Sequence, residues 1–199
     1  MALQLVTAPA AIFDTAIAKA HLRVDASDED TLIDAMAAAA VDAVQQYTGL
    51  ALKDQTYDFY LDEFPSDGSP IQLPKPPLIE VVGLYYLDSG GVEQEWDAAN
   101  YIVDSASRKA RIALPSSGSW PTAATRINAV RIRFRAGFLD QSVSPAEANV
   151  PAGLIAAVKL VMSNLFENRE ANVIGVSVSE LPMGAKYLMD FYRVETGMA

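Results

Sequence analysis

The chain has 199 residues, of which 51% are hydrophobic, and it carries a formal net charge of −10 with no cysteine. This composition favours a packed core over global disorder, and it excludes disulfides, thiolate metal sites and a cysteine nucleophile. The negative charge argues against broad binding of nucleic acid through its phosphates. No uncharged apolar run reaches the roughly 18 residues of a membrane span, and the N-terminus lacks the basic region of a secretory signal. We therefore expect synthesis in the cytoplasm and no membrane association.

The N-terminal region predicts two helices after a short lead-in. Residues 1–13 are expected to be flexible or extended, and Asp14 or Thr15 to cap a short helix that ends near Leu22. Ser27, with an acidic residue three positions later, has the spacing of a capping signal for a second helix from about residue 29 to 47. The expected buried positions of that helix are Leu32, Ile33, Met36, Ala40, Val41, Val44 and Tyr47.

From about residue 54 the hydrophobic period changes from that of a helix to that of a strand. Tyr57, Phe59 and Leu61 alternate with polar side chains, which predicts a half-buried strand. The β-branched and aromatic run 78–88, followed by a Ser-Gly-Gly turn, predicts a hairpin into residues 92–96. Further strands are expected at residues 101–103, 110–114 and 130–135. Together these segments predict an antiparallel β module of about six or seven short strands.

Residues 151–169, PAGLIAAVKLVMSNLFENR, predict a helix that is apolar over most of its circumference. Such a helix must be covered by other parts of the chain or by other copies of it. We expect the surface around Leu160 and Val161 to be covered in one of these ways. The buried stripe is predicted at Ile155, Val158, Met162, Leu165 and Phe166, and it is widened by Leu154, Leu160 and Val161.

The predicted fold class is α+β, a helical bundle with an inserted antiparallel β module. The bundle combines N-terminal helices with the long C-terminal helix. The expected division is an N-terminal helical part at 1–53, the β module at 54–138 and a C-terminal helical part at 139–199. The last part contains a short helix at 185–193 and a terminal tail with little apolar content.

No catalytic or cofactor motif is present in the sequence: there is no P-loop, no GxGxxG and no GxSxG. His21 has no cysteine or second histidine to complete an ordinary metal site, so a position on a helix surface or in packing is favoured. The acidic cluster at Asp25, Asp28, Glu29 and Asp30 is better explained by helix capping than by a cation site. A carboxylate pair of a glycosidase has no motif in its favour. We expect no enzyme activity, no cofactor and no metal.

Arg131, Arg133 and Arg135 alternate along one predicted strand and therefore lie on one face of it. Seven of the 15 basic residues lie between residues 108 and 135, whereas 18 of the 25 acidic residues precede residue 105. This asymmetry favours a salt-bridge surface between subunits, in which Arg126 and the three strand arginines face the acidic N-terminal half around Asp28 and Glu29. A solvated strand face and a direct DNA contact are the alternatives.

The middle of the chain is rich in aromatic residues. Tyr85, Tyr86, Trp96 and Trp120 are better explained as core and edge residues of the β module than as a platform for sugars. A carbohydrate- or receptor-binding β module of a virion protein is nevertheless the alternative function.

Several segments, in order, resemble the phage head–tail connector (adaptor) family, in particular its longer members with a β insertion. They are KAHLRVD at 19–25, DTLIDAMAAAAVDAVQQYTG at 30–49, the LYYLD hairpin strand, RINAVRIRFRAGF, VPAGLIAAVKLVMSNLFENRE and the final ELPMGAKYLMDFYR. No single segment is highly specific, but the ordered set covers most of the chain.

The resemblance implies a non-enzymatic virion protein of the neck. Members of the family form a closed ring of about twelve subunits beneath the portal, with DNA passing through the centre without sequence-specific binding. The ring joins the head to the tail or to a head-completion (stopper) protein, and gene transfer agents use related parts. The C-terminal region of the family engages the portal. In this chain the corresponding residues are Tyr187, Phe191, Tyr192, Arg193, Val194, Glu195 and Met198.

Overall fold

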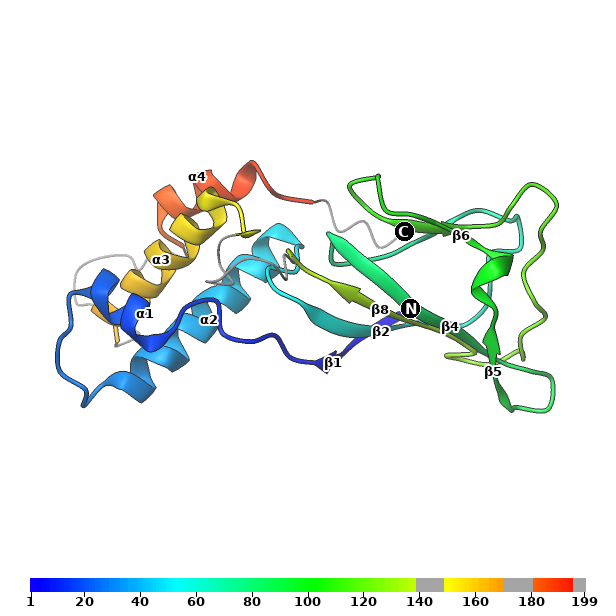
Figure 1. Ribbon diagram of the computed structural model, residues 1–199, viewed down its shortest axis with the longest axis horizontal. Coiled ribbons are helices and arrows are strands. Elements are labelled where there is room, and N and C mark those ends of the chain that lie inside the picture. Colours follow the sequence, from blue (N-terminus) through cyan, green and yellow to red (C-terminus); the bar gives the residue numbers. More distant parts are fainter. Residues whose placement is uncertain (139–148, 170–180, 195–199) are drawn as a thin grey trace. The chain divides into compact units, whose positions relative to one another are not determined.

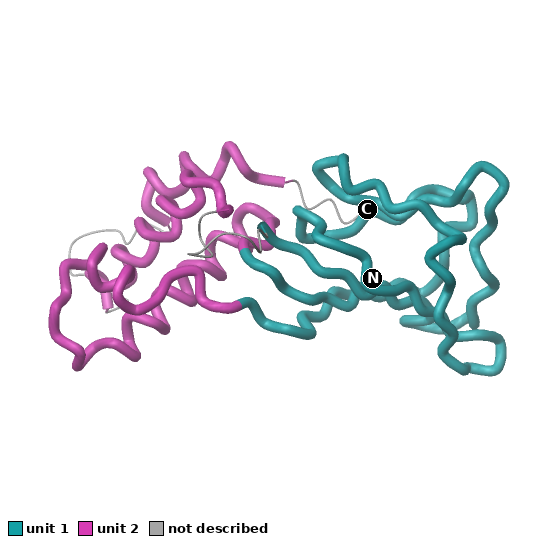
Figure 2. Tube along the Cα trace, viewed as in Figure 1, with its two compact units in different colours: residues 1–9, 53–139 teal, residues 10–52, 140–199 magenta. Residues whose placement is uncertain are grey.

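The computed structural model describes residues 1–138, 149–169 and 181–194. The chain divides into two compact units (Figure 2). Residues 1–9 and 53–139 form the sheet unit, and residues 10–52 and 140–199 form the helical unit. The predicted α+β class is confirmed. The first nine residues, however, belong with the strands and not with the N-terminal helices.

The sheet unit contains two antiparallel sheets (Figure 1). The larger sheet has the strand order β1-β2-β8-β4-β5, and the smaller one has the order β3-β7-β6. The predicted hairpin is present as β4 and β5, which a turn at residues 88–91 connects. The strands are β1 (Ala2–Thr7), β2 (Gln55–Leu61), β3 (Ile71–Gln72), β4 (Leu78–Leu87), β5 (Glu93–Trp96), β6 (Ile102–Asp104), β7 (Arg111–Ala113) and β8 (Val130–Ala136), with a 3-10 turn, η1 (Ala98–Asn100), before β6.

The lead-in is more ordered than the sequence predicted. Residues 2–7 form β1, which pairs antiparallel with β2 from Ala2 opposite Tyr60 to Thr7 opposite Thr56. Of the two alternatives, an extended segment is correct and a flexible segment is wrong. The local sequence could not predict this strand, because β1 forms its backbone hydrogen bonds with a strand about fifty residues later in the chain.

The two faces of the central strands differ in the way that the alternation predicted. On β8, Val130, Ile132 and Phe134 are fully buried. Phe134 stacks on Tyr57 of β2 with ring centroids 5.6 Å apart. The arginines between these residues point to the opposite face, because successive side chains of a strand alternate.

The helical unit is built from α1 (Thr15–Leu22), α2 (Asp30–Thr48), α3 (Ala152–Glu167) and α4 (Met183–Asp190). Within it α3 packs against α1, α2 and α4. No helix in the described parts of the chain has the length and apolar character needed to cross a bilayer.

The predicted cap of α1 is confirmed and that of α2 is wrong. The Asp14 carboxylate accepts the backbone N–H of Ile17 at 2.8 Å. Ser27 does not cap α2 with its side chain; Glu29 occupies the cap position and makes no side-chain capping bond. Instead the carbonyl of Ser27 accepts the N–H of Asp30, which closes a turn before the helix.

The buried side of the long helix α3 overlaps only in part with the predicted stripe. Val158 and Met162 are fully buried as expected, but Ile155, Leu165 and Phe166 are only half-buried. Leu154 and Val161, which were predicted to widen the stripe, lie in the core together with Ala157. Val161 is therefore covered within the chain. Leu160 is still 38% exposed.

Candidate functional site

The three arginines of β8 form a ladder of ion pairs across the larger sheet. Arg133 and Asp58 lie opposite each other on β8 and β2. Their hydrogen bonds are bidentate, with Nε donating to Oδ1 at 2.8 Å and Nη2 donating to Oδ2 at 2.7 Å. The carboxylate is only 6% exposed. Such a fork is the strongest ordinary geometry for this kind of pair.

The arginines on either side of Arg133 are paired in the same way. Arg131 donates to both oxygens of Glu93 on β5, at 3.0 and 2.8 Å. Its guanidinium also lies 4.1 Å from the centroid of the Tyr85 ring. Arg135 donates to Asp54 and to Glu80. We call Arg131, Arg133, Arg135 and these acidic partners the arginine ladder.

The electrostatics of the pair formed by Arg133 and Asp58 favour the charged forms of both residues. Hydrogen bonds from Arg133 lower the pKa of Asp58, and the same bonds raise the pKa of Arg133. The sequence-based interpretation sought the acidic partners in another subunit, but the structure provides them within the same sheet unit, on β2, β4 and β5 and, for Asp54, directly before β2. A contact between subunits through Arg126, Arg131, Arg133, Arg135, Asp28 and Glu29 stays a prediction.

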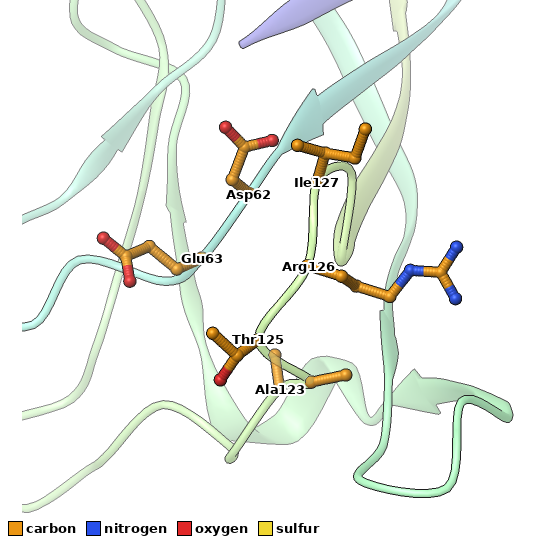
Figure 3. A pocket seen from close by; sticks show the side chains of 7 residues that line it. Asp62, Glu63, Ala123, Thr125, Arg126 and Ile127 are labelled. Atoms are coloured by element: carbon orange, nitrogen blue, oxygen red, sulfur yellow. The ribbon is translucent and has the colours of Figure 1, made fainter.

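Two of these predicted contact residues, Glu29 and Arg126, lie outside the arginine ladder. Glu29 accepts hydrogen bonds from Arg169 at 2.6 and 3.1 Å, inside the helical unit. Arg126 lines an open pocket of about 380 Å³ in the sheet unit. In Figure 3 the carboxylates of Asp62 and Glu63 lie on one side of this pocket, and the guanidinium of Arg126 extends to the other. The charged groups therefore do not converge on a common point.

The aromatic residues of the sheet unit pack on one another. Phe64 stacks on Trp120 with centroids 5.1 Å apart, and Trp96 lies 5.3 Å from Trp120. Tyr101 stacks on Trp96 at 5.6 Å, and Tyr86 meets the edge of Phe64 at 6.2 Å. A sugar platform needs an exposed ring face, and these rings cover each other. Their arrangement agrees with the interpretation as core and edge residues.

His21 has structural partners, and so do Glu29 and Asp30 of the acidic cluster. His21 Nε2 lies 3.0 Å from Ser163 Oγ and 3.2 Å from the Lys159 carbonyl, so this residue joins α1 to α3. Lys19 pairs with Asp30 at 2.7 Å. Within residues 1–138, 149–169 and 181–194, no three potential metal ligands lie close enough to share an ion.

The predicted portal-binding residues divide into outward and inward ones. Tyr187 and Phe191 are 66% and 65% exposed, and their rings meet edge to face with centroids 5.0 Å apart. Met183, one turn earlier, is 85% exposed. We call Met183, Tyr187 and Phe191 the aromatic face of α4. The other side of α4, with Ala185 and Met189, is buried.

The residues that follow α4 turn back onto the helical unit. The guanidinium of Arg193 lies over the Tyr47 ring at 5.4 Å, and the Tyr47 hydroxyl donates to Asp190 at 2.6 Å. Val194 is buried, and its N–H donates to the Thr48 carbonyl at 2.8 Å. The side chain and the amide of Val194 are therefore both engaged within the unit, and its contact with the portal stays a prediction.

Three other predicted residues complete the C-terminal set. Tyr192 is half-buried and lies near Gly153 of α3, where an added Cβ would come within 3.0 Å of the tyrosine ring. Glu195 and Met198 lie outside the described residues. The aromatic face is thus the part of the predicted surface that is described and exposed. Its signal in the sequence was the i, i+4, i+8 spacing of three large apolar residues on a short helix.

Comparison with known proteins indicates the kind of protein to which these surfaces belong. The sequence profile of a family described as phage gp6-like head–tail connector protein matches residues 16–85. That segment runs from α1 to β4. The resemblance to head–tail connectors is confirmed. No curated protein sequence matches this chain.

Solved structures similar to this chain come from necks and virions of gene transfer agents (GTAs). A chain from the neck of an empty GTA particle, computed with sixfold symmetry, matches with a TM-score of 0.77 and 27% identity. A chain from the virion of a native GTA particle matches with a TM-score of 0.79 and 26% identity. A third, from the neck of a native GTA particle computed with twelvefold symmetry, has a TM-score of 0.72 and 26% identity. Each match covers 98% of this chain and 96% of the other chain. These similarities support a structural role of this chain in the neck of a phage-like particle.

Proposed function

We propose that this connector forms a ring of about twelve copies in the neck, below the portal, and acts without enzymatic activity. The observation that carries this proposal is the match over 98% of the chain to a protein from a neck with twelvefold symmetry. A ring that closes needs two different contact surfaces on each subunit. The family and the similar particles are structural, which supports a role in assembly and not in catalysis.

The aromatic face of α4 is our candidate for the portal contact. Large exposed aromatic residues are enriched in protein interfaces, and a few of them contribute most of the binding energy. Tyr187 and Phe191 are held in a fixed edge-to-face pair, so little side-chain freedom is lost when they bind. The chain continues from this face through residues 195–199, which include the predicted portal residues Glu195 and Met198. The opposite side of the ring would meet the tail or a head-completion protein.

Passage of DNA requires weak contact with its phosphates. The net charge of −10 and the internal pairing of the β8 arginines both lower the affinity for phosphate. DNA would therefore pass through the ring without sequence-specific binding and without being held.

The test uses the full chain and a purified portal of the same particle. We expect Tyr187→Ser combined with Phe191→Ser to weaken binding at least about tenfold, which corresponds to about 1.4 kcal/mol. The matched control is Leu32→Ser, since Leu32 is an exposed apolar residue of α2 in the same unit, 38% exposed. Biolayer interferometry measures the affinity, and electron microscopy of the complex counts the copies.

Two outcomes would overturn the proposal. A parent protein that stays monomeric with the portal and never joins a particle excludes the ring. An affinity unchanged by the double substitution excludes the aromatic face as the portal contact, even where the ring forms.

A further inference from the structure

The strand β1 is an unprotected edge of the larger sheet. It hydrogen-bonds to β2 on one side, and no strand among the described residues pairs with its other side. All six of its residues are exposed, and none is charged or a proline. Natural sheet edges are ordinarily protected by charges, prolines, short length or a covering segment. A bulge near Thr7 is the one protective device that β1 carries.

The side chains of β1 extend the apolar face of the sheet beyond its covered part. Leu3 and Leu5 are 37% and 47% exposed, and they lie opposite the buried residues Phe59 and Tyr57 of β2. Val6 is 44% exposed. An open backbone edge next to an apolar strip is the arrangement that accepts an added strand from another chain.

Another edge of the sheet unit fits β1 in chemistry. The strand β6 lies at the edge of the smaller sheet, with Ile102 53% and Val103 38% exposed. Its single acid, Asp104, already accepts hydrogen bonds from Ser107 and Arg111. Pairing β6 with β1 would therefore join two apolar edges and leave no new charge without a partner.

The other edges fit less well. The strand β5 carries Glu93 and Glu95, and β1 has no cation to compensate carboxylates that would lose water. The strand β3 has only two residues. Pairing β1 with its own copy would be isologous and would close as a dimer, not as a ring.

We propose that the β1 edge of one copy pairs with the β6 edge of the next copy, so that strand pairing joins neighbouring subunits of the ring. This inference rests on the proposed ring. The two strands are edges of different sheets within one unit, at separate places in Figure 1, and so they provide the two different surfaces that head-to-tail closure needs.

Cysteine cross-linking tests this contact directly, because the natural chain contains no cysteine. We expect the double variant Leu5→Cys with Val103→Cys, assembled on the portal and treated with a short bis-maleimide, to form a ladder of covalent oligomers. The single variant Leu5→Cys should give no cross-linked dimer. The control Leu5→Cys with Val82→Cys should give no ladder, although Val82 is equally apolar and 46% exposed on β4.

A charged side chain introduced on the β1 edge provides a second test of the pairing. We expect Leu5→Lys to fold, as judged by circular dichroism and thermal unfolding, but to lose ring assembly on the portal. Val82→Lys is the matched control and should assemble as the parent does. Native mass spectrometry measures the number of copies in each complex.

The outcomes separate this inference from the proposed function. Where the parent forms a ring, the absence of a ladder from the variant Leu5→Cys with Val103→Cys, or normal assembly of Leu5→Lys, overturns the pairing of β1 with β6 and leaves the ring in place. A dimer from Leu5→Cys alone shows isologous pairing of β1 and also overturns it. A parent that forms no ring overturns both proposals.

Discussion

The outward faces of β8 and α4 differ in what they leave available to a partner. The arginines of β8 form ion pairs with Asp58, Glu93, Asp54 and Glu80 inside the sheet unit. The aromatic face of α4 has large apolar side chains that are more than three-fifths exposed. In the sequence the arginines were the more conspicuous candidates for a contact. In the structure their hydrogen-bonding capacity is largely used within the chain.

The difference shows that a row of charged residues and an exposed aromatic pair are not equally available for binding a partner. A guanidinium that already holds a bidentate carboxylate must lose that partner before it can bind another, and this exchange gains little. An exposed aromatic ring loses only water when a partner covers it. We therefore expect substitutions in the ladder to act on stability and substitutions in the aromatic face to act on assembly.

The largest effect on stability is expected in the core on which α4 rests. Leu154 of α3 is fully buried, so Leu154→Ala should lower the free energy of unfolding by about 3 kcal/mol. Its neighbour Ile155 is half-buried, and Ile155→Ala should cost clearly less. Urea unfolding followed by circular dichroism measures both. An equal or larger loss at Ile155 would mean that α3 turns its other side to the core.

A smaller but clear loss is expected in the ladder. Asp58→Ala should lower the free energy of unfolding by about 2 kcal/mol, because it leaves the guanidinium of Arg133 without its partner at a partly buried site. The matched control is Glu93→Ala, whose side chain is 50% exposed and should cost at most about 1 kcal/mol. If both variants are as stable as the parent, the ladder does not stabilise the sheet unit and its arginines are available for partners.

The same carboxylate predicts a dependence on pH. Arg133 lowers the pKa of Asp58 below its ordinary value of 3.8, so the unfolded state takes up a proton more readily than the folded one. The stabilisation is complete above 3.8 and is lost as the pH falls through the lower pKa of the folded state. Unfolding curves at several acidic pH values should show a shallower loss for Asp58→Asn than for the parent. Identical pH profiles would contradict this assignment.

The smallest effect on stability is expected at the aromatic face. Tyr187→Ser and Phe191→Ser should each leave the free energy of unfolding within about 0.5 kcal/mol of the parent, because both side chains are exposed. Met189→Ala on the buried side of α4 is the contrasting variant and should destabilise strongly. Thermal unfolding distinguishes them. A large loss at Tyr187 would mean that the pair has a structural role.

Much of the fold could be predicted because it depends on local patterns. The alternation around Tyr57 and Phe134 predicts strands, the turn after β4 predicts a hairpin, and Asp14 predicts a helix start; each is present. Contact of the C-terminal residues with the portal stays a prediction, and the structure shows only how exposed these residues are. Tyr187 and Phe191 are exposed, but Val194 is buried, since burial depends on where the chain turns after α4 and no spacing in the sequence records that turn.

By itself the sequence determined the α+β class, the kind and approximate place of most elements, and the resemblance to head–tail connectors. These follow from the periods of 3.6 and 2 residues and from short motifs in a fixed order. Only the tertiary structure decided which side of α3 is buried, which strand pairs with β1, and which carboxylates hold the β8 arginines. Arg133 and Asp58 are 75 positions apart in the chain. A pairing over that separation is set by the register of β2 against β8, and strand register depends on contacts throughout the sheet and not on any local pattern.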